Sequence, residues 1–448
     1  MSDFSVFCDI DHPALLQNLQ RMGIEQPTEV QERTIDAVLD GSDCVVSAPT
    51  GSGKTLAFLL PVMQALHSEK RKSGRVRALV LSPTRELARQ IVEHGRKLCD
   101  RNAVNVVALT GGDHKRTQEI YLHDADLLVA TPGRLAEYVG EARIDLSALQ
   151  FLVVDEADRT LDMGFANEVT QIAYNCNPER QTLLFSATMQ GSGVEEFVAA
   201  LTDPNTRVNI HVENQLDQRS MQKILVDERE HVERLMPALL AEREFRRAMI
   251  FVNKREQADK LNEVLKLAGC RSASLHGEMD ASVRKQVHKA FSSGEVNVLV
   301  ATDLAARGLD ISGVDLVINA ELPYNVPSFI HRAGRTGRMG KIGCVISLVS
   351  APAWNRMAAI ERFLGRSAEL VKVSGFESSY KGPKKTRASG KVAGRKKTSA
   401  EKKKSQARSG KDKPKEKKNR LRDQKNVGKR RKPNSKPDST GGNKPEVS

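Results

Sequence analysis

The sequence predicts an α/β protein with two tandem parallel-sheet domains and a disordered basic tail. Short β-branched and Leu-rich segments alternate with amphipathic segments from Asp43 onward, and the same rhythm restarts after a polar passage at 202–219. Beyond about Ser378 the chain is almost devoid of apolar residues. A chain of 448 residues is also longer than one hydrophobic core usually serves.

The apolar runs are short enough to be buried strands that helices cover on both faces. We expect the first domain at 1–206, a linker at 207–219 and the second domain at 220–370, closed by a helix at 354–363. The segments at 127–134 and 298–308 resemble each other, which indicates equivalent strand ends in two similar domains. The expected strands are CVVSA, RALVLS, DLLVAT, FLVVDE and QTLLFS in the first domain, and KILV, AMIFVN, NVLVAT, DLVINA and CVISLV in the second.

Positive charge is concentrated in the tail. Residues 381–448 hold 26 Lys and Arg against 6 Asp and Glu, whereas residues 1–380 hold 44 against 50. A polyanion bound by the mildly acidic body must therefore meet a local basic groove or backbone NH groups. The tail at 376–448 lacks the apolar residues that would offset its ordering entropy, so we expect disorder there.

Cysteine usage and hydropathy indicate a cytoplasmic protein. The 6 cysteines are isolated in the sequence, which fits a reducing compartment better than a zinc site or a redox pair. The N-terminus lacks a basic start followed by an apolar run, and the longest apolar stretch, near 56–66, is shorter than a bilayer requires. We expect no membrane association.

A strand followed by a glycine-rich turn and a helix predicts a phosphate-binding loop. Successive backbone NH groups and the helix N-terminus would hold the β-phosphate, Lys54 would reach the β- and γ-oxygens, and Thr55 would ligate Mg²⁺. The alternative is an ordinary glycine-rich turn before a helix, although the Lys-Thr pair argues against it. The loop comprises Ala48, Pro49, Thr50, Gly51, Ser52, Gly53, Lys54 and Thr55.

Two acids leave the end of the expected strand FLVV, where ligands of an open sheet usually bind. Asp155 is placed to hold Mg²⁺ directly or through water, and Glu156 to orient and deprotonate the water that attacks the γ-phosphate. Without the phosphate loop, these acids would be interpreted as a solvated helix start.

The segment HRAGRTGR at 331–338 carries three arginines in a glycine-punctuated helix and turn. Guanidinium groups suit phosphates, so Arg335 and Arg338 are candidates for arginine fingers that the second domain supplies across a cleft. A surface basic patch that binds polyanions without catalysis is the alternative.

Taken together, the ordered segments over about residues 4–370 resemble the DEAD-box family of ATP-dependent RNA helicases. The order is GIEQPTEVQ at 23–31, within a Q motif at 4–32, then the phosphate loop, PTREL at 83–87, GG at 111–112, TPGR at 131–134, DEAD at 155–158, SAT at 186–188, IFVN at 250–253, the segment 302–310 and HRAGRTGR. The resemblance implies two RecA-like domains, an RNA-stimulated ATPase and helicase activity, and ATP and Mg²⁺ as cofactors.

The resemblance also assigns roles to individual residues. Gln31 would read the adenine edge, with Phe7 closing the base pocket, and Asp310 would contact the ribose. Ser186 and Thr188 would couple hydrolysis to RNA binding. The RNA groove would be formed by Pro83, Thr84, Arg85, Gly112, Thr131, Gly133 and Arg134 of the first domain and by Arg284 and Thr302 of the second.

Such a protein would close two loosely linked domains around ATP and one RNA strand, bend the strand and locally unwind a duplex or remodel an RNA–protein complex. The contacts would favour the sugar-phosphate backbone, and 2′-hydroxyls would set the preference for RNA. Ribosome assembly and RNA decay are the candidate pathways, with ribosomal RNA or a ribonucleoprotein as partner, and we expect a monomer.

Three alternatives remain open from the sequence. The chain is an ATP-gated RNA clamp or assembly scaffold if strand separation is incidental, and a DNA translocase of the same superfamily if it steps along a deoxy strand. The basic tail is either an electrostatic arm that holds RNA near the motor or a solubilising segment.

Overall fold

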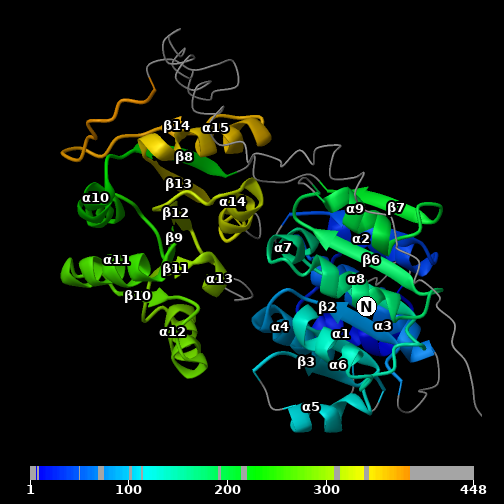
Figure 1. Ribbon diagram of the computed structural model, residues 1–448. Helices are drawn as coiled ribbons and strands as arrows, with labels where there is room; N and C mark the ends of the chain where they lie inside the picture. The colour runs from blue at the N-terminus through cyan, green and yellow to red at the C-terminus, as the bar shows by residue number, and fades with distance from the viewer. Residues whose placement is uncertain are drawn as a thin grey trace, which may run out of the picture. The chain divides into compact units, whose positions relative to one another are not determined.

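The computed structural model describes residues 7, 10–49, 51–68, 75–99, 103–112, 115–189, 193–212, 219–306, 313–337 and 343–383. Two parallel sheets organise these residues, and Figure 1 shows helices on both faces of each. We call residues 10–212 lobe one and residues 219–383 lobe two. No helix in the described ranges is long and apolar enough to cross a membrane.

Lobe one is built on seven parallel strands in the order β3-β4-β2-β5-β6-β1-β7. Successive side chains of β1 point to opposite faces of the sheet and so belong to two different hydrophobic cores. Cys44 and Val46 lie in the core that includes residues of α1 to α4, whereas Val45 lies in the core that includes residues of α6, α8 and α9. The strands are β1 (Asp43–Ser47), β2 (Ala78–Leu81), β3 (Val106–Leu109), β4 (Leu127–Ala130), β5 (Phe151–Val154), β6 (Gln181–Ser186) and β7 (Arg207–His211). The helices are α1 (Pro13–Arg21), α2 (Glu29–Leu39), α3 (Lys54–Ser68), α4 (Arg85–Leu98), α5 (Lys115–Leu122), α6 (Pro132–Gly140), α7 (Ala157–Asp162), α8 (Ala166–Tyr174) and α9 (Val194–Leu201).

Lobe two repeats this arrangement with the strand order β10-β11-β9-β12-β13-β8-β14. Its strands are β8 (Ser220–Leu225), β9 (Ala248–Val252), β10 (Ser272–Leu275), β11 (Val298–Thr302), β12 (Leu316–Asn319), β13 (Cys344–Val349) and β14 (Glu369–Leu370). Its helices are α10 (Arg229–Ala241), α11 (Arg255–Leu267), α12 (Ala281–Ser293), α13 (Asp303–Ala306), α14 (Val326–Ala333), the 3₁₀ turn η3 (Ala351–Ala353) and α15 (Trp354–Phe363).

Each strand of lobe two occupies the position of the strand seven places earlier in lobe one. The similar segments at 127–134 and 298–308 accordingly begin on β4 and β11, which are equivalent strands. The predictions of two parallel-sheet α/β domains and of a closing helix at 354–363 are therefore confirmed.

The predicted domain boundaries need two corrections. The linker was expected at 207–219, but residues 207–211 form β7, which pairs in parallel with β1 through backbone hydrogen bonds that the side-chain pattern does not disclose. Disorder was expected from 376, but the C-terminal segment, residues 371–383, packs on lobe two. The remainder of the predicted tail lies outside the described residues.

Buried and polar contacts explain why the C-terminal segment is ordered. Val373 is 1% exposed within a core of lobe two. The Asp227 carboxylate accepts hydrogen bonds from the backbone N of Ser379 (2.8 Å), its Oγ (2.7 Å) and the backbone N of Tyr380 (2.9 Å). Nε2 of His231 donates to the carbonyl of Phe376 at 2.8 Å. Lobe two therefore extends past residue 370.

Candidate active site

The predicted phosphate loop leaves the carboxyl end of β1 and leads into α3. Gly53 adopts φ +98°, and a Cβ there would lie 2.5 Å from Nε2 of Gln31, so no other residue fits without displacing that side chain. Thr50, in the middle of the loop, lies outside the described residues. The described part of the loop leads into the N-terminus of α3, whose free NH groups suit a phosphate.

Lys54 is buried at the start of α3, with only 8% of its surface exposed. Its Nζ donates to the carbonyls of Ala48 (2.7 Å) and Pro49 (3.2 Å). Burial lowers the pKa of Lys54, and the charges of Asp155, Asp158 and Glu156 oppose that shift. A phosphate oxygen would replace neutral carbonyls as partner of this ammonium group, which makes the exchange favourable.

Asp155 follows β5 and is 4% exposed. Burial, reinforced by the neighbouring Glu156 charge, raises the pKa of Asp155 to about 7, and Lys54 only partly compensates. Its Oδ1 accepts a hydrogen bond from the backbone N of Glu156 at 2.9 Å. A buried carboxylate that lacks sufficient positive charge is suited to a divalent cation.

Glu156 adopts the left-handed conformation, with φ 49° and ψ 55°. A residue with a side chain pays about 1 kcal/mol or more for this geometry, which frequently marks a functional position. Its Oε2 is buried without a hydrogen-bond partner among the described residues, although it lies 3.5 Å from Nε of Arg159. The strained turn therefore orients a carboxylate oxygen that remains available as a proton acceptor.

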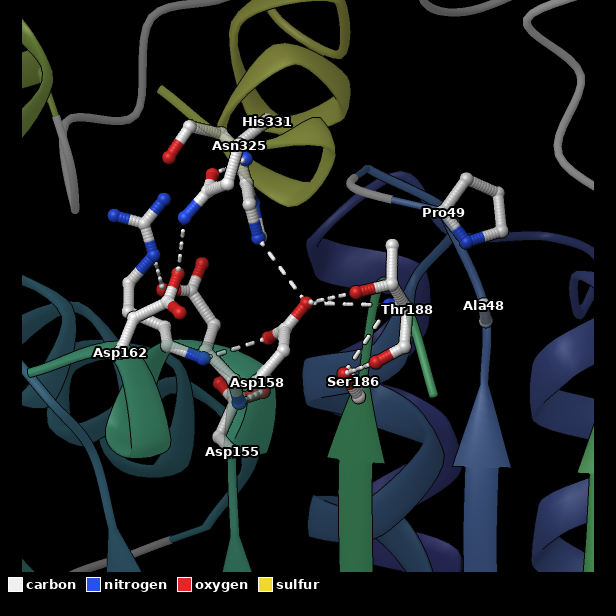
Figure 2. A network of polar contacts seen from close by, with 12 residues as sticks. Ala48, Pro49, Asp155, Asp158, Asp162, Ser186, Thr188, Asn325 and His331 are labelled. Atoms are coloured by element: carbon white, nitrogen blue, oxygen red, sulfur yellow. Dashed lines mark hydrogen bonds and ion pairs between the residues drawn. The ribbon is translucent and has the colours of Figure 1, made fainter. Parts of the chain in front are cut away.

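The second aspartate of the DEAD segment, Asp158, is the centre of the polar network in Figure 2. Its Oδ2 accepts hydrogen bonds from the backbone N (3.2 Å) and Oγ1 (3.1 Å) of Thr188, and lies 3.4 Å from Nε2 of His331. Thr188 is linked in turn to Ser186, whose Oγ donates to the Thr188 carbonyl at 2.5 Å. One carboxylate of α7 thus contacts the segment that follows β6 and α14 of lobe two.

Asp158 is 5% exposed, and its environment favours the charged form. Burial alone would raise its pKa, but the hydrogen bond and charge of His331, followed by the charges of Lys54 and Arg159, outweigh burial and hold the pKa below its ordinary value. A nearby pair, Nδ2 of Asn325 and Oδ2 of Asp162 at 3.1 Å, adds a second polar contact between the lobes.

Arg332 and Arg335 have different surroundings in lobe two. Arg332 is 1% exposed, and its Nε and Nη2 contact the two oxygens of Asp303 at 2.6 and 2.8 Å. It also donates to Oδ1 of Asn253 (2.8 Å), so it ties together the ends of β9 and β11. Arg335 lies just past the end of α14 and is 7% exposed. Arg338 and Asp310 lie outside the described residues.

Gln31 contacts the phosphate loop directly. Its Nε2 donates to the Gly53 carbonyl (3.1 Å) and its Oε1 accepts from the Thr28 backbone N (2.9 Å), which leaves the amide one further donor and one further acceptor position. Phe7 is 4% exposed in a core of lobe one. The roles of Gln31 and Phe7 towards a base stay predictions.

The predicted RNA residues of lobe one lie at one edge of the sheet, because they follow the adjacent strands β3, β4 and β2. Thr84 and Thr131 are the N-cap residues of α4 and α6. The Arg85 guanidinium lies over Gly112, where a Cβ would come within 2.3 Å of its Nη1. Pro83, Gly133 and Arg134 belong to the same edge, and Arg134 contacts Glu137 at 3.1 Å.

In lobe two, Thr302 ends β11 and Arg284 lies on α12. Nη1 of Arg284 contacts Oε1 of Glu86 in lobe one at 2.7 Å, with side chains 19% and 27% exposed. The sequence placed Arg284 in the RNA groove, and that role stays a prediction. In the structure its partner is a carboxylate of the other lobe.

Several residues with strong interactions were not assigned roles from the sequence: Asp158, His331, Arg332, Glu86 and Asn325. The first four lie within the segments DEAD, HRAGRTGR and PTREL, so their position in those segments was the available signal. Their partners are far away in sequence, and only the fold brings them together.

The residues present fit a magnesium ion that is shared with a nucleotide. Mg²⁺ is usually held by one or two carboxylates together with substrate phosphates, rather than by a complete protein cage. In keeping with this, the described residues contain no group of three or more His, Cys, Asp or Glu side chains able to hold a metal. Asp155 and the hydroxyl of Thr55, the last residue of the phosphate loop, would be the matching ligands.

Comparisons with known proteins agree with this geometry. Residues 28–197 match the DEAD/DEAH box helicase family, and residues 228–340 match the helicase conserved C-terminal domain. The chain is 40% identical over 431 residues to the ATP-dependent RNA helicase SrmB of Haemophilus influenzae, covering 94% of this chain and 97% of that protein. It is also 40% identical to Escherichia coli SrmB, over 78% of this chain and 80% of that protein.

A solved structure has the same two-domain fold. Saccharomyces cerevisiae Dbp5 bound to RNA and ADP BeF3 superimposes with a TM-score of 0.73 at 26% sequence identity, covering 83% of this chain and 96% of that chain.

Proposed function

Because the chain belongs to the DEAD-box family of ATP-dependent RNA helicases, we propose that ATP is held by lobe one and hydrolysed when arginine from lobe two reaches its γ-phosphate. The protein is an RNA-stimulated ATPase and RNA helicase. The observation that carries the two-lobe mechanism is Asp158, whose single carboxylate contacts both Thr188 of lobe one and His331 of lobe two.

The phosphate loop and Lys54 bind the β- and γ-phosphates of ATP, and Gln31 reads the adenine edge. Asp155 and Thr55 hold Mg²⁺, which would neutralise charge on the β- and γ-oxygens. Binding of a cation beside Asp155 removes the burial cost that raises its pKa. This relief supports Asp155 as a metal ligand.

Glu156 orients the attacking water and accepts its proton. The left-handed backbone fixes the direction of its side chain, and Oε2 makes no hydrogen bond among the described residues, although Arg159 forms an ion pair with it at 3.5 Å. Arg335, with Arg338, stabilises the charge on the transferred phosphoryl group. Since acid and arginine come from different lobes, hydrolysis depends on their approach.

RNA binding is coupled to hydrolysis through the network in Figure 2. RNA at the carboxyl edges of β2, β3, β4 and β11 favours the same arrangement of the lobes as the contact of His331 with Asp158. ATP and RNA therefore strengthen each other's binding by the same factor. Unwinding follows if the bound strand is bent as the lobes close. A target in ribosome assembly or RNA decay stays a prediction.

The test uses the full-length protein and separates binding from turnover. Arg335→Ala should lower RNA-stimulated kcat by about 10³-fold with little change in ATP affinity, whereas Arg234→Ala, an exposed arginine of lobe two, should change neither. Glu156→Gln should abolish turnover and prolong RNA retention. Normal RNA-stimulated hydrolysis by Arg335→Ala would refute the two-lobe mechanism. A biological role that survives Glu156→Gln would favour the clamp or scaffold.

A further inference from the structure

Lobe two contains a cavity at the position that corresponds to the phosphate loop of lobe one. The equivalence of the two sheets places β8, β12 and β13 where lobe one has β1, β5 and β6. The carboxyl ends of these three strands, with that of β9, surround a cavity of about 680 Å³. Such a volume is ordinary for small-molecule sites, which favour this edge of α/β sheets.

The cavity is not a second triphosphate site. In lobe one, residues 48–53 connect β1 to α3, whereas in lobe two residues 226–228 connect β8 to α10. This shorter turn has the sequence Val-Asp-Glu, without glycine or the following Lys-Thr pair. Two carboxylates thus stand where lobe one presents backbone NH groups, which disfavours a triphosphate.

The wall of the cavity instead presents aromatic and cationic groups. Tyr324 is 75% exposed, and the Arg356 guanidinium carbon lies 5.3 Å from the centre of its ring. Lys254, Arg229 and Tyr380 line the same cavity. A tyrosine braced by arginine and left largely open to solvent is a stacking platform for a planar group, and adjacent cations suit a phosphate.

Most carboxylates of the lining already have partners. Asp227 accepts hydrogen bonds from the C-terminal segment, and Glu233 contacts Lys260 at 2.8 Å. Glu321 accepts from the backbone N of Asn253 (2.8 Å) and from the side chain of Gln257 (2.6 Å). The fourth, Glu228, is the N-cap residue of α10. The lining also holds three cationic side chains, Arg229, Lys254 and Arg356. With Lys260 beside Glu233, four acids stand against four cationic groups, so the cavity carries no net negative charge that would repel a phosphate.

The basic tail begins at this cavity. Tyr380, which lines the wall, is anchored through Asp227, and the sequence becomes rich in Lys and Arg directly after it. A Cβ at Gly382 would lie 3.7 Å from the Trp354 ring, so the described chain ends against lobe two. The many basic residues that follow Tyr380 in the sequence favour a polyanion such as RNA as the ligand.

We propose that this cavity binds one nucleoside monophosphate unit, with the base stacked on Tyr324 and the phosphate at Lys254 and Arg356, and that single-stranded RNA supplies it. The site lies within lobe two and is separate from the phosphate loop. It rests on the RNA activity of the family and not on the roles proposed for the ATP-site residues.

The test is photo-crosslinking of full-length protein to single-stranded RNA that contains 4-thiouridine, without ATP, with adducts mapped by mass spectrometry. Adducts on Tyr324 or Tyr380 are expected. Tyr324→Ala and Arg356→Ala should lower the adduct yield at this wall about tenfold, and Tyr324→Phe should retain it. Tyr174→Ala, which alters a 90% exposed tyrosine of lobe one, should leave the yield unchanged.

A second arm identifies the source of the nucleoside. If millimolar AMP or UMP removes the adducts while the RNA stays bound, or protects Tyr324 from chemical modification without RNA, the site stands and free nucleotide is its ligand. No adduct on this wall and no protection by either nucleotide would overturn the proposal, as would an equal yield from Tyr324→Ala. Since no ATP turnover is measured, neither result bears on the mechanism at Glu156.

Discussion

Replacing Asp155 by Asn should stabilise the ligand-free protein, and the gain should increase with pH. Burial raises the pKa of Asp155 from 3.8 to about 7, so the native chain binds more protons than the unfolded chain between these values. Stability therefore falls as pH rises through this interval. Asparagine does not titrate, and its Oδ1 keeps the hydrogen bond from the Glu156 backbone N.

The magnitude follows from the pKa. Between pH 5 and pH 8 the native carboxyl loses its proton at about pH 7, so the destabilisation grows over about two pH units, or about 3 kcal/mol. For a domain the size of lobe one, about 1 kcal/mol shifts Tm by roughly 2–4 °C. The difference in Tm between Asp155→Asn and the original protein should thus widen by about 6–12 °C.

The assay is thermal unfolding at pH 5, 6, 7 and 8 in EDTA without nucleotide. Asp40→Asn, which changes an exposed acid of the same lobe, is the control for the loss of one carboxylate charge. If the Tm difference for Asp155→Asn stays constant from pH 5 to pH 8, Asp155 is already ionised in the native protein and the reasoning about its burial is wrong.

Three further substitutions test other contacts. His331→Ala should lower RNA-stimulated kcat about tenfold while leaving ATP affinity nearly unchanged, and equal losses in both would contradict a coupling role. A double-mutant cycle with Glu86→Gln and Arg284→Gln measures RNA affinity in the presence of a non-hydrolysable ATP analogue. The two substitutions should be coupled by about 1 kcal/mol, and additive effects would exclude an energetic contribution of this contact. Asp227→Ala should speed deuterium exchange of the C-terminal segment at least about tenfold, without changing exchange in lobe one.

The fold was predictable where hydrophobic runs were long. The expected strands correspond to β1, β2, β4, β5 and β6 in lobe one and to β8, β9, β11, β12 and β13 in lobe two. The strands without a predicted counterpart are β3, β7, β10 and β14. They lie at or next to the sheet edges, where burial is incomplete and runs such as SASL of β10 carry hydroxyl side chains. Pairing with a neighbour decides their conformation.

The candidate site was predictable where one continuous segment contains both the side chain that binds the ligand and the backbone that positions it. The phosphate loop is such a segment, because its glycines, lysine and helix start are consecutive. Asp158 is different, since its partner Thr188 lies just after β6 and its partner His331 lies on α14. Sequence spacing carries no information about distances across the fold, so this convergence needed coordinates. The C-terminal segment is ordered by Asp227 and His231 for the same reason.

The division of chemistry between the lobes follows from the turn after the first strand of each sheet. A glycine-rich turn of residues 48–53 suits a phosphate, whereas the shorter turn of residues 226–228 with two acids does not, which supports our proposal that ATP binds lobe one. Lobe two carries Arg335, but in the proposed mechanism this side chain reaches the γ-phosphate only when the two lobes approach each other. Two of the described contacts that join them, Arg284 with Glu86 and Asn325 with Asp162, are at least partly exposed and are worth at most about 1 kcal/mol each, whereas the contact of His331 with Asp158 is buried. Because few of the described contacts join the lobes, the proposed mechanism leaves the timing of hydrolysis to ligands that bridge both lobes.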